Sequence, residues 1–255
     1  MVEMLTGVLE KNGLVTAFAL VGITMYLSYI ISNKLTKGRI HGSAIAIILG
    51  LVLAYFGGIH TGGEKGLADI SIFAGIGLMG GGMLRDLAII ATAFGVRLEE
   101  VKKAGLNGII ALFVGVFSSF LVGVIVALSF GYTDAASLTT IGAGATTYIV
   151  GPVTGAAVGA SSEVIALSIA AGLIKAILIM VATPFVAKYI GLNNPRAAVV
   201  YGGLMGSTSG VAGGLAATDP KLVPYGAMTA TFYTGLGCLL VPSVLFLIMQ
   251  AIFGS

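Results

Sequence analysis

Two tracts rich in Gly, Ser and Thr interrupt a chain that is otherwise apolar. They cover residues 138–163 (LTTIGAGATTYIVGPVTGAAVGASSE) and 202–220 (GGLMGSTSGVAGGLAATDP). Backbone that leaves a helix at membrane depth is tolerated only where protein or a water-filled cavity satisfies its polar groups. Two such tracts, separated by one apolar stretch, therefore predict the two halves of a transport site.

The composition indicates an integral membrane protein. Hydrophobic residues make up 57% of the 255 residues, charged residues only 9%, and the mean hydropathy is +1.07, whereas a soluble domain carries roughly 25% charge. The basic residues lie singly in short loops, so they indicate topology and not nucleic-acid binding. We expect one all-α polytopic transporter domain over residues 1–255.

The apolar stretches predict about six transmembrane helices, because each is close to the roughly 20 residues that cross a bilayer. They are Leu14–Ile31, Ile40–Gly57, Ala68–Leu84, Ala104–Phe130, Val164–Ala187 and Tyr225–Phe253. The segment after Leu84 alternates apolar and charged residues at helical spacing, which favours a helix lying in the membrane interface.

The basic residues decide how the two tracts cross the membrane. Lys188, Arg196 and Lys221 all fall on the cytoplasmic side only if both tracts are re-entrant hairpins that enter from opposite faces. Thr154-Gly155 corresponds in spacing to Ser209-Gly210, and a proline follows each tract. An inverted repeat of this kind is typical of alternating-access carriers.

A broken helix offers ligands for both an anion and a cation. Its exposed N–H groups and positive dipole end suit a carboxylate, and its exposed carbonyls suit Na⁺. The candidate substrate ligands are Thr146, Thr147, Thr154, Gly155, Ser207, Thr208, Ser209 and Gly210, and the candidate cation ligands are Gly151, Gly206 and Asn107. The alternative function of the tracts is close helix packing by small residues.

Lys175 is a further candidate, because about ten apolar residues flank it on either side. A charge at the bilayer centre costs a few kcal/mol or more and normally faces the interior of the bundle. Lys175 is expected to offset substrate charge, to act in cation coupling, or to pair with a carboxylate. Glu163 and Asp219 are predicted helix caps, and His41 and His60 lack the spacing of metal ligands.

The run IFAGIGLMGGGMLRDLAIIATAFGVRLEEVKKAG and the two tracts resemble the larger membrane subunit of the bacterial malonate carrier, the MadM family, over essentially the whole chain. The resemblance implies malonate as substrate, Na⁺ as coupling ion, the bacterial inner membrane as location, and a smaller membrane subunit, MadL, as partner. It assigns no binding residues, so the candidates above rest on the physical argument.

The first tract is also similar to the β subunit of sodium-pumping carboxylate decarboxylases. Ala143-Gly144-Ala145 stands where that family has an acidic residue, which argues against a pump. We therefore expect a secondary carrier without catalytic residues or an organic cofactor, which moves malonate with Na⁺. The alternative is the membrane subunit of a decarboxylase-driven sodium pump.

Overall fold

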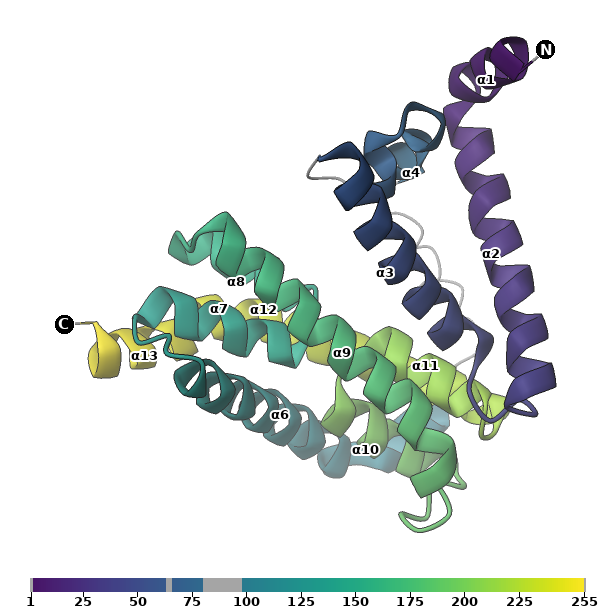
Figure 1. Cartoon of the computed structure of the whole chain (residues 1–255). Coiled ribbons are helices and arrows are strands. Elements are labelled where there is room, and N and C mark those ends of the chain that lie inside the picture. Colours follow the sequence, from purple (N-terminus) through teal and green to yellow (C-terminus); the bar gives the residue numbers. More distant parts are fainter. Residues whose placement is uncertain (1, 63–65, 80–97, 255) are drawn as a thin grey trace. The chain divides into compact units, whose positions relative to one another are not determined.

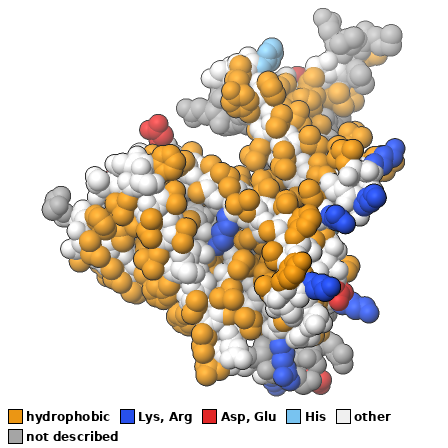
Figure 2. Space-filling view, turned by 60° about the horizontal axis from the view of Figure 1, so that its bottom comes forward, with side chains coloured by type: hydrophobic (Ala, Val, Ile, Leu, Met, Phe, Trp, Pro, Cys, Tyr) orange, Lys and Arg blue, Asp and Glu red, His pale blue; other side chains and the backbone are white. Residues whose placement is uncertain are grey.

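The computed structural model describes all residues except 1, 63–65, 80–97 and 255. In the described part, five helical stretches are long and apolar enough to cross a membrane: Gly13–Leu35, Gly42–Thr61, Gly105–Ser129, Ser162–Val186 and Pro220–Phe253. Hydrophobic side chains are spread over the whole visible face (Figure 2). These features confirm an all-α polytopic membrane protein. The chain divides into two compact units, Met1–Ala91 and Thr92–Ser255.

The first unit is built on two spans joined by a tight turn. It contains α1 (Val2–Lys11), α2 (Gly13–Leu35), α3 (Gly42–Thr61), η1 (Gly66–Asp69), η2 (Ser71–Phe73) and α4 (Gly75–Met79). The turn uses Lys37 and Gly38 at φ 52° and 77°. The side chain of His41 caps α3 by accepting a hydrogen bond from the Ser43 N–H. After the turn, α3 packs alongside α2 (Figure 1).

The third predicted span is corrected in its described part. Residues 68–79 form two short 3-10 turns and the five-residue helix α4 instead of one continuous helix. Gly75 lies so close to the backbone of Gly13 that a Cβ atom there would overlap it. Apolar composition alone does not reveal such a close backbone approach. The rest of this span and most of the predicted interfacial helix lie outside the described residues.

The second unit contains both tracts, and each folds as two short helices. Its elements are α6 (Leu98–Ser129), α7 (Ala135–Thr146), α8 (Val150–Val158), α9 (Ser162–Val186), α10 (Pro195–Met205), α11 (Thr208–Ala216), η3 (Pro220–Leu222), α12 (Val223–Leu240), η4 (Val241–Leu245, a π-helical turn) and α13 (Phe246–Phe253). Gly105, at φ 48° and ψ −136°, interrupts α6 after its charged first turns. The 12 residues of α7 reach about 18 Å, well short of the roughly 30 Å hydrocarbon core.

The two helix pairs approach from opposite ends of this unit. The first pair, α7 and α8, packs beside η4 and α13, at the C-terminal end of the last span. The second pair, α10 and α11, packs on α12, with α11 also against η3 at the N-terminal end of that span. Figure 1 shows the same opposition, with α8 and α7 near α13 and α10 and α11 away from it. The second unit therefore has the opposed hairpins that the sequence predicts.

Polar side chains start each hairpin and the span that follows. Asp134 caps α7 by accepting from the Ser137 N–H at 2.8 Å, and Asn194 caps α10 by accepting from the Ala197 N–H at 3.0 Å. Asp219 caps η3, as predicted. Glu163 is not a cap, because Ser161 caps α9 and Glu163 lies in the first turn, where its charge favours the positive helix end.

The ends of the second unit differ in charge, which predicts its orientation. Lys188, Arg196 and Lys221 lie at the end where the second hairpin enters, and Asp134 and Glu163 lie at the other end. Because basic loops stay in the cytoplasm, the Asn193→Cys variant should be protected from a membrane-impermeant thiol reagent in intact cells. The Thr133→Cys variant should react.

Both variants are made in a Cys238→Ala background, which removes the only native cysteine. Asn193 and Thr133 are both exposed, so permeabilised cells should label both equally. Labelling of the Asn193→Cys variant from outside would show that the second unit has the opposite orientation.

Candidate functional site

The two hairpin breaks lie against the middle of α9. The first break follows Thr146, and a Cβ atom on Gly172 of α9 would overlap the backbone of Tyr148 within it. The second break is at Gly206 and Ser207, and Gly210 beyond it lies against the Ala176 carbonyl of α9. The segment 172–176 of α9 is thus where the two hairpins approach each other.

Four helix ends meet at these breaks. The C-termini of α7 and α10 end there, and the N-termini of α8 and α11 begin there. A helix N-terminus carries partial positive charge and a C-terminus partial negative charge. The arrangement therefore presents groups for an anion and for a cation near one position, without an acidic side chain.

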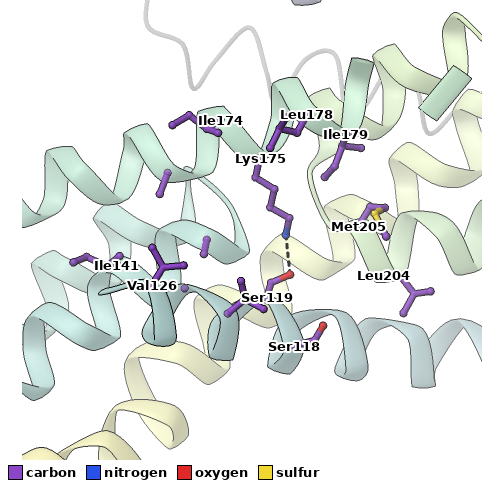
Figure 3. Close-up of a pocket in the computed structure, with 14 residues that line it drawn as sticks. Ser118, Ser119, Val126, Ile141, Ile174, Lys175, Leu178, Ile179, Leu204 and Met205 are labelled. Carbon is purple, nitrogen blue, oxygen red and sulfur yellow. Dashed lines mark hydrogen bonds between the residues drawn. The ribbon is translucent and has the colours of Figure 1, made fainter. Parts of the chain in front are cut away.

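The ammonium of Lys175 lies at this meeting point and bridges three elements. Its Nζ donates to the Ser119 hydroxyl of α6 at 2.9 Å, to the Thr146 carbonyl of α7 at 2.8 Å, and to the Tyr233 hydroxyl of α12 at 3.4 Å. Figure 3 shows the side chain extending from α9 toward α6. None of these acceptors carries a formal negative charge, so the ammonium is hydrogen-bonded without a carboxylate among its described partners.

Tyr233 connects this ammonium to the second hairpin. The side chain is fully buried, and its hydroxyl donates to the Gly115 carbonyl of α6 at 3.0 Å. Its ring lies 5.2 Å, centroid to Nζ, from Lys175, within the range of a cation–π interaction. The ring also packs on Gly206, at the end of α10. Lys175 touches the tip of the first hairpin and Tyr233 the tip of the second.

A cavity of about 620 Å³ in the second unit has Lys175 in its lining. It lies between α6 and α9, and the last turns of α7 and α10 contribute Ala145, Leu204 and Met205. Most of the lining is apolar, and Ser118, Ser119 and Lys175 are its polar side chains. Leu178 and Val122 in its lining are more than half exposed, so the cavity is open to the surface of the second unit.

The sequence matches the family described as malonate/sodium symporter MadM subunit over residues 5–253. The chain belongs to this family. The searches of curated proteins and of solved structures returned no match. The family assignment makes the chain a subunit of a malonate/sodium symporter, as the resemblance implied, and the spans make it a multi-pass membrane protein.

The predicted ligands of the first tract take different positions in this MadM-family subunit. Thr146 ends α7 and offers its carbonyl to Lys175, while its hydroxyl bonds to Ala143. The Thr147 hydroxyl accepts from the Ile149 and Val150 N–H groups and so stabilises the break. Thr154 is fully buried in α8, and its hydroxyl has no hydrogen-bond partner among the described residues.

The glycines of the first tract lie at packing contacts. Gly151 packs against the Ser168 side chain, and Gly155 packs against Thr140 and Ile165. Neither glycine lies at the break itself. A bulky substitution there would disturb helix packing, so it would not distinguish a packing role from a ligand role.

The second tract is organised by its capping residues. Gly206 ends α10 at φ 71°, and the buried Ser207 caps α11 by accepting from the Gly210 N–H at 3.3 Å. Thr208 and Ser209 form the half-buried first turn of α11. Their role as substrate ligands stays a prediction.

Asn107 does not join the other candidates. It is exposed on α6, two residues beyond the Gly105 break. Twelve helical residues separate it from Ser119, which is about 18 Å along the axis. A cation role for Asn107 would require a site separate from the Lys175 cluster.

Sequence reasoning missed Ser119 and Tyr233. One signal was available for Tyr233: it stands nine residues before Pro242, as Lys175 stands nine residues before Pro184. The two side chains thus stand at corresponding positions of the predicted repeats. Ser119 carries no such signal, because single serines are common in membrane helices that pack closely.

Both the positive φ of Gly206 and the neighbouring Tyr233 ring disfavour a side chain at this position. An L residue at positive φ costs about 1 to 2 kcal/mol, and a Cβ atom would also overlap the Tyr233 ring. The Gly206→Ala variant should therefore lower the thermal stability of the purified protein and reduce transport.

Gly235→Ala is the matched control, because a Cβ atom there meets nothing within 4 Å. It lies within α12, where alanine should be neutral or stabilising by up to about 1 kcal/mol. Equal unfolding temperatures for the two variants would show that the Tyr233 ring does not pack against Gly206.

Proposed function

We propose that this subunit carries malonate and Na⁺ together across the bacterial inner membrane by alternating access. The family supplies the substrate and the coupling ion. The observation that carries the mechanism is the meeting of two opposed hairpin breaks at Lys175 and Tyr233. An inverted pair of this kind places one central site between two halves that can rock against each other.

Malonate is assigned to the N-terminal ends of α8 and α11. Both ends carry the partial positive charge of a helix N-terminus. The start of α11 also offers the N–H groups of Thr208 and Ser209, whereas the first N–H groups of α8 are bonded to Thr147 and Pro152 has none. Lys175 contacts the first break directly and the second through Tyr233. The dianion needs positive charge around it in a site of low dielectric constant. One ammonium and the co-transported Na⁺ supply that charge. The apolar cavity beside Lys175 supplies none and is not assigned to malonate.

A smaller membrane subunit of the MadL type is the proposed partner. The family description calls the protein a subunit, which supports a second chain in the assembly. We place both chains in the inner membrane, where an external dicarboxylate enters the cell. No enzymatic step and no organic cofactor is part of the proposal.

Uptake into proteoliposomes tests the function directly. Liposomes that contain this subunit with its partner should accumulate labelled malonate when an inward Na⁺ gradient is imposed. Replacing Na⁺ by choline should abolish accumulation. The subunit reconstituted without the partner shows whether the second chain is needed.

A decarboxylase-driven pump subunit would behave differently. It would move Na⁺ only together with a soluble biotin-dependent enzyme and would not accumulate malonate. Sodium-independent malonate accumulation would contradict the symport, and no accumulation with the complete assembly would contradict the carrier itself.

Thr154 gives a test that separates ligand binding from packing. Its buried hydroxyl lacks a described partner, and such a group costs about 1 to 3 kcal/mol. The Thr154→Val variant keeps the shape but removes the hydroxyl. It should raise the unfolding temperature of the ligand-free protein, and it should raise the malonate or Na⁺ concentration needed for half-maximal uptake.

Thr139→Val is the control for this prediction. The Thr139 hydroxyl is equally buried but bonds to the Ala135 carbonyl at 2.6 Å, so its removal should not stabilise the protein. Normal uptake by a stabilised Thr154→Val variant would remove Thr154 from the binding site.

A further inference from the structure

The surroundings of the Lys175 ammonium have the chemistry of a monovalent cation site. An ammonium has three donors, and here each points to an oxygen: a hydroxyl of α6, a backbone carbonyl of α7 and a phenol of α12. We call Ser119 Oγ, the Thr146 carbonyl oxygen and Tyr233 Oη the oxygen cage. All three oxygens are neutral.

The same oxygens suit a sodium ion. In transporters with broken helices, the carbonyls at the C-terminal end of a half-helix coordinate Na⁺, and the Thr146 carbonyl ends such a half-helix. Hydroxyl oxygens complete a shell of hard ligands. The ammonium and Na⁺ carry the same charge and use the same acceptors, so they cannot occupy the cage together.

We propose that Lys175 holds the Na⁺ site in the substrate-free protein and that Na⁺ displaces its ammonium when malonate binds. This inference rests on the proposed malonate/Na⁺ symport. The displaced ammonium turns on its flexible four-carbon stem toward the malonate carboxylates at the starts of α8 and α11. Lys175 is then the group that couples the two ligands.

The exchange predicts that neither ligand binds well alone. Na⁺ without malonate must expel an ammonium that has no other acceptor in a membrane interior. Malonate without Na⁺ must take the ammonium from three oxygens and leave them unpaired. Each ligand therefore raises the affinity for the other by the same factor, as linkage requires.

A purely structural role for Lys175 predicts a different result for a neutral variant. If the lysine only ties α6, α7 and α12 together, the protein needs the ammonium in the cage in every state. Its replacement by a neutral side chain would then loosen the bundle, and Na⁺ would not restore it. In the exchange mechanism Na⁺ fills the vacated cage and restores the missing charge.

The test measures Na⁺ binding in the absence of malonate. Purified parent protein and the Lys175→Met variant are heated at increasing NaCl, with choline chloride holding the ionic strength constant. Ligand binding raises the unfolding temperature by a known relation to its affinity. Because no ammonium competes, the variant should bind Na⁺ at least about tenfold more tightly than the parent. Malonate should no longer strengthen Na⁺ binding.

A second substitution locates the ion. Adding Ser119→Ala to the Lys175→Met variant removes one cage oxygen, so it should weaken Na⁺ binding several-fold. Ser129→Ala on the same helix is the control, since that hydroxyl bonds only to Val126 near the exposed end of α6. It should leave Na⁺ affinity unchanged.

Each result decides the inference. Unchanged or weaker Na⁺ binding by the Lys175→Met variant would overturn it, as would equal effects of the two serine substitutions. Lys175→Gln is made alongside as a second neutral variant that keeps a polar N–H donor. If neither neutral variant assembles in Na⁺-containing membranes, Na⁺ does not replace the ammonium, and the inference fails. The parent protein's own malonate uptake reports separately on the proposed function.

Discussion

The hydrogen bonds of one ammonium connect four helices at the centre of the second unit. A charge at mid-membrane is costly unless polar groups surround it, so the position of Lys175 requires that α6, α7 and α12 bring oxygens to α9. They do so with one hydroxyl, one helix-end carbonyl and one phenol. The Tyr233 hydroxyl passes the network on to the Gly115 carbonyl. The network thus contacts the tip of the first hairpin through Thr146, and the Tyr233 ring contacts the tip of the second at Gly206.

Small residues make that network possible, since they allow the backbones to approach. Side chains at Gly115, Gly172 or Gly202 would overlap the backbone of the neighbouring element. In lipid, helices associate through such close packing because no hydrophobic driving force acts between them. Packing and ligand binding are therefore not exclusive roles for the Gly/Ser/Thr tracts. The glycines form the contacts, and the breaks between them expose the helix ends.

Hydropathy and charge predicted the broken tracts, five of the spans and the central lysine, because each depends on local composition. The third span was not predictable in this way: the Gly13–Gly75 contact that accompanies its broken backbone joins residues far apart in sequence. The same limit applies to the site. The residue types of Thr147 and Ser207 predicted ligands, but their hydroxyls accept hydrogen bonds from the Ile149 and Gly210 N–H groups. Ser119 and Tyr233 acquire their role only from the helix that faces them.

The two repeats place different chemistry at corresponding positions. Lys175 and Tyr233 stand at the same distance before a proline, yet one ends in an ammonium on the Thr146 carbonyl and the other places a ring over Gly206. The ring packs on Gly206 at the end of α10, whereas the end of α7 offers its Thr146 carbonyl to the Lys175 ammonium. In the proposed exchange, only the end of α7 holds the cation. The proposed exchange between Lys175 and Na⁺ requires this asymmetry, because a second equivalent cage would bind Na⁺ without displacing the lysine and would uncouple it from malonate.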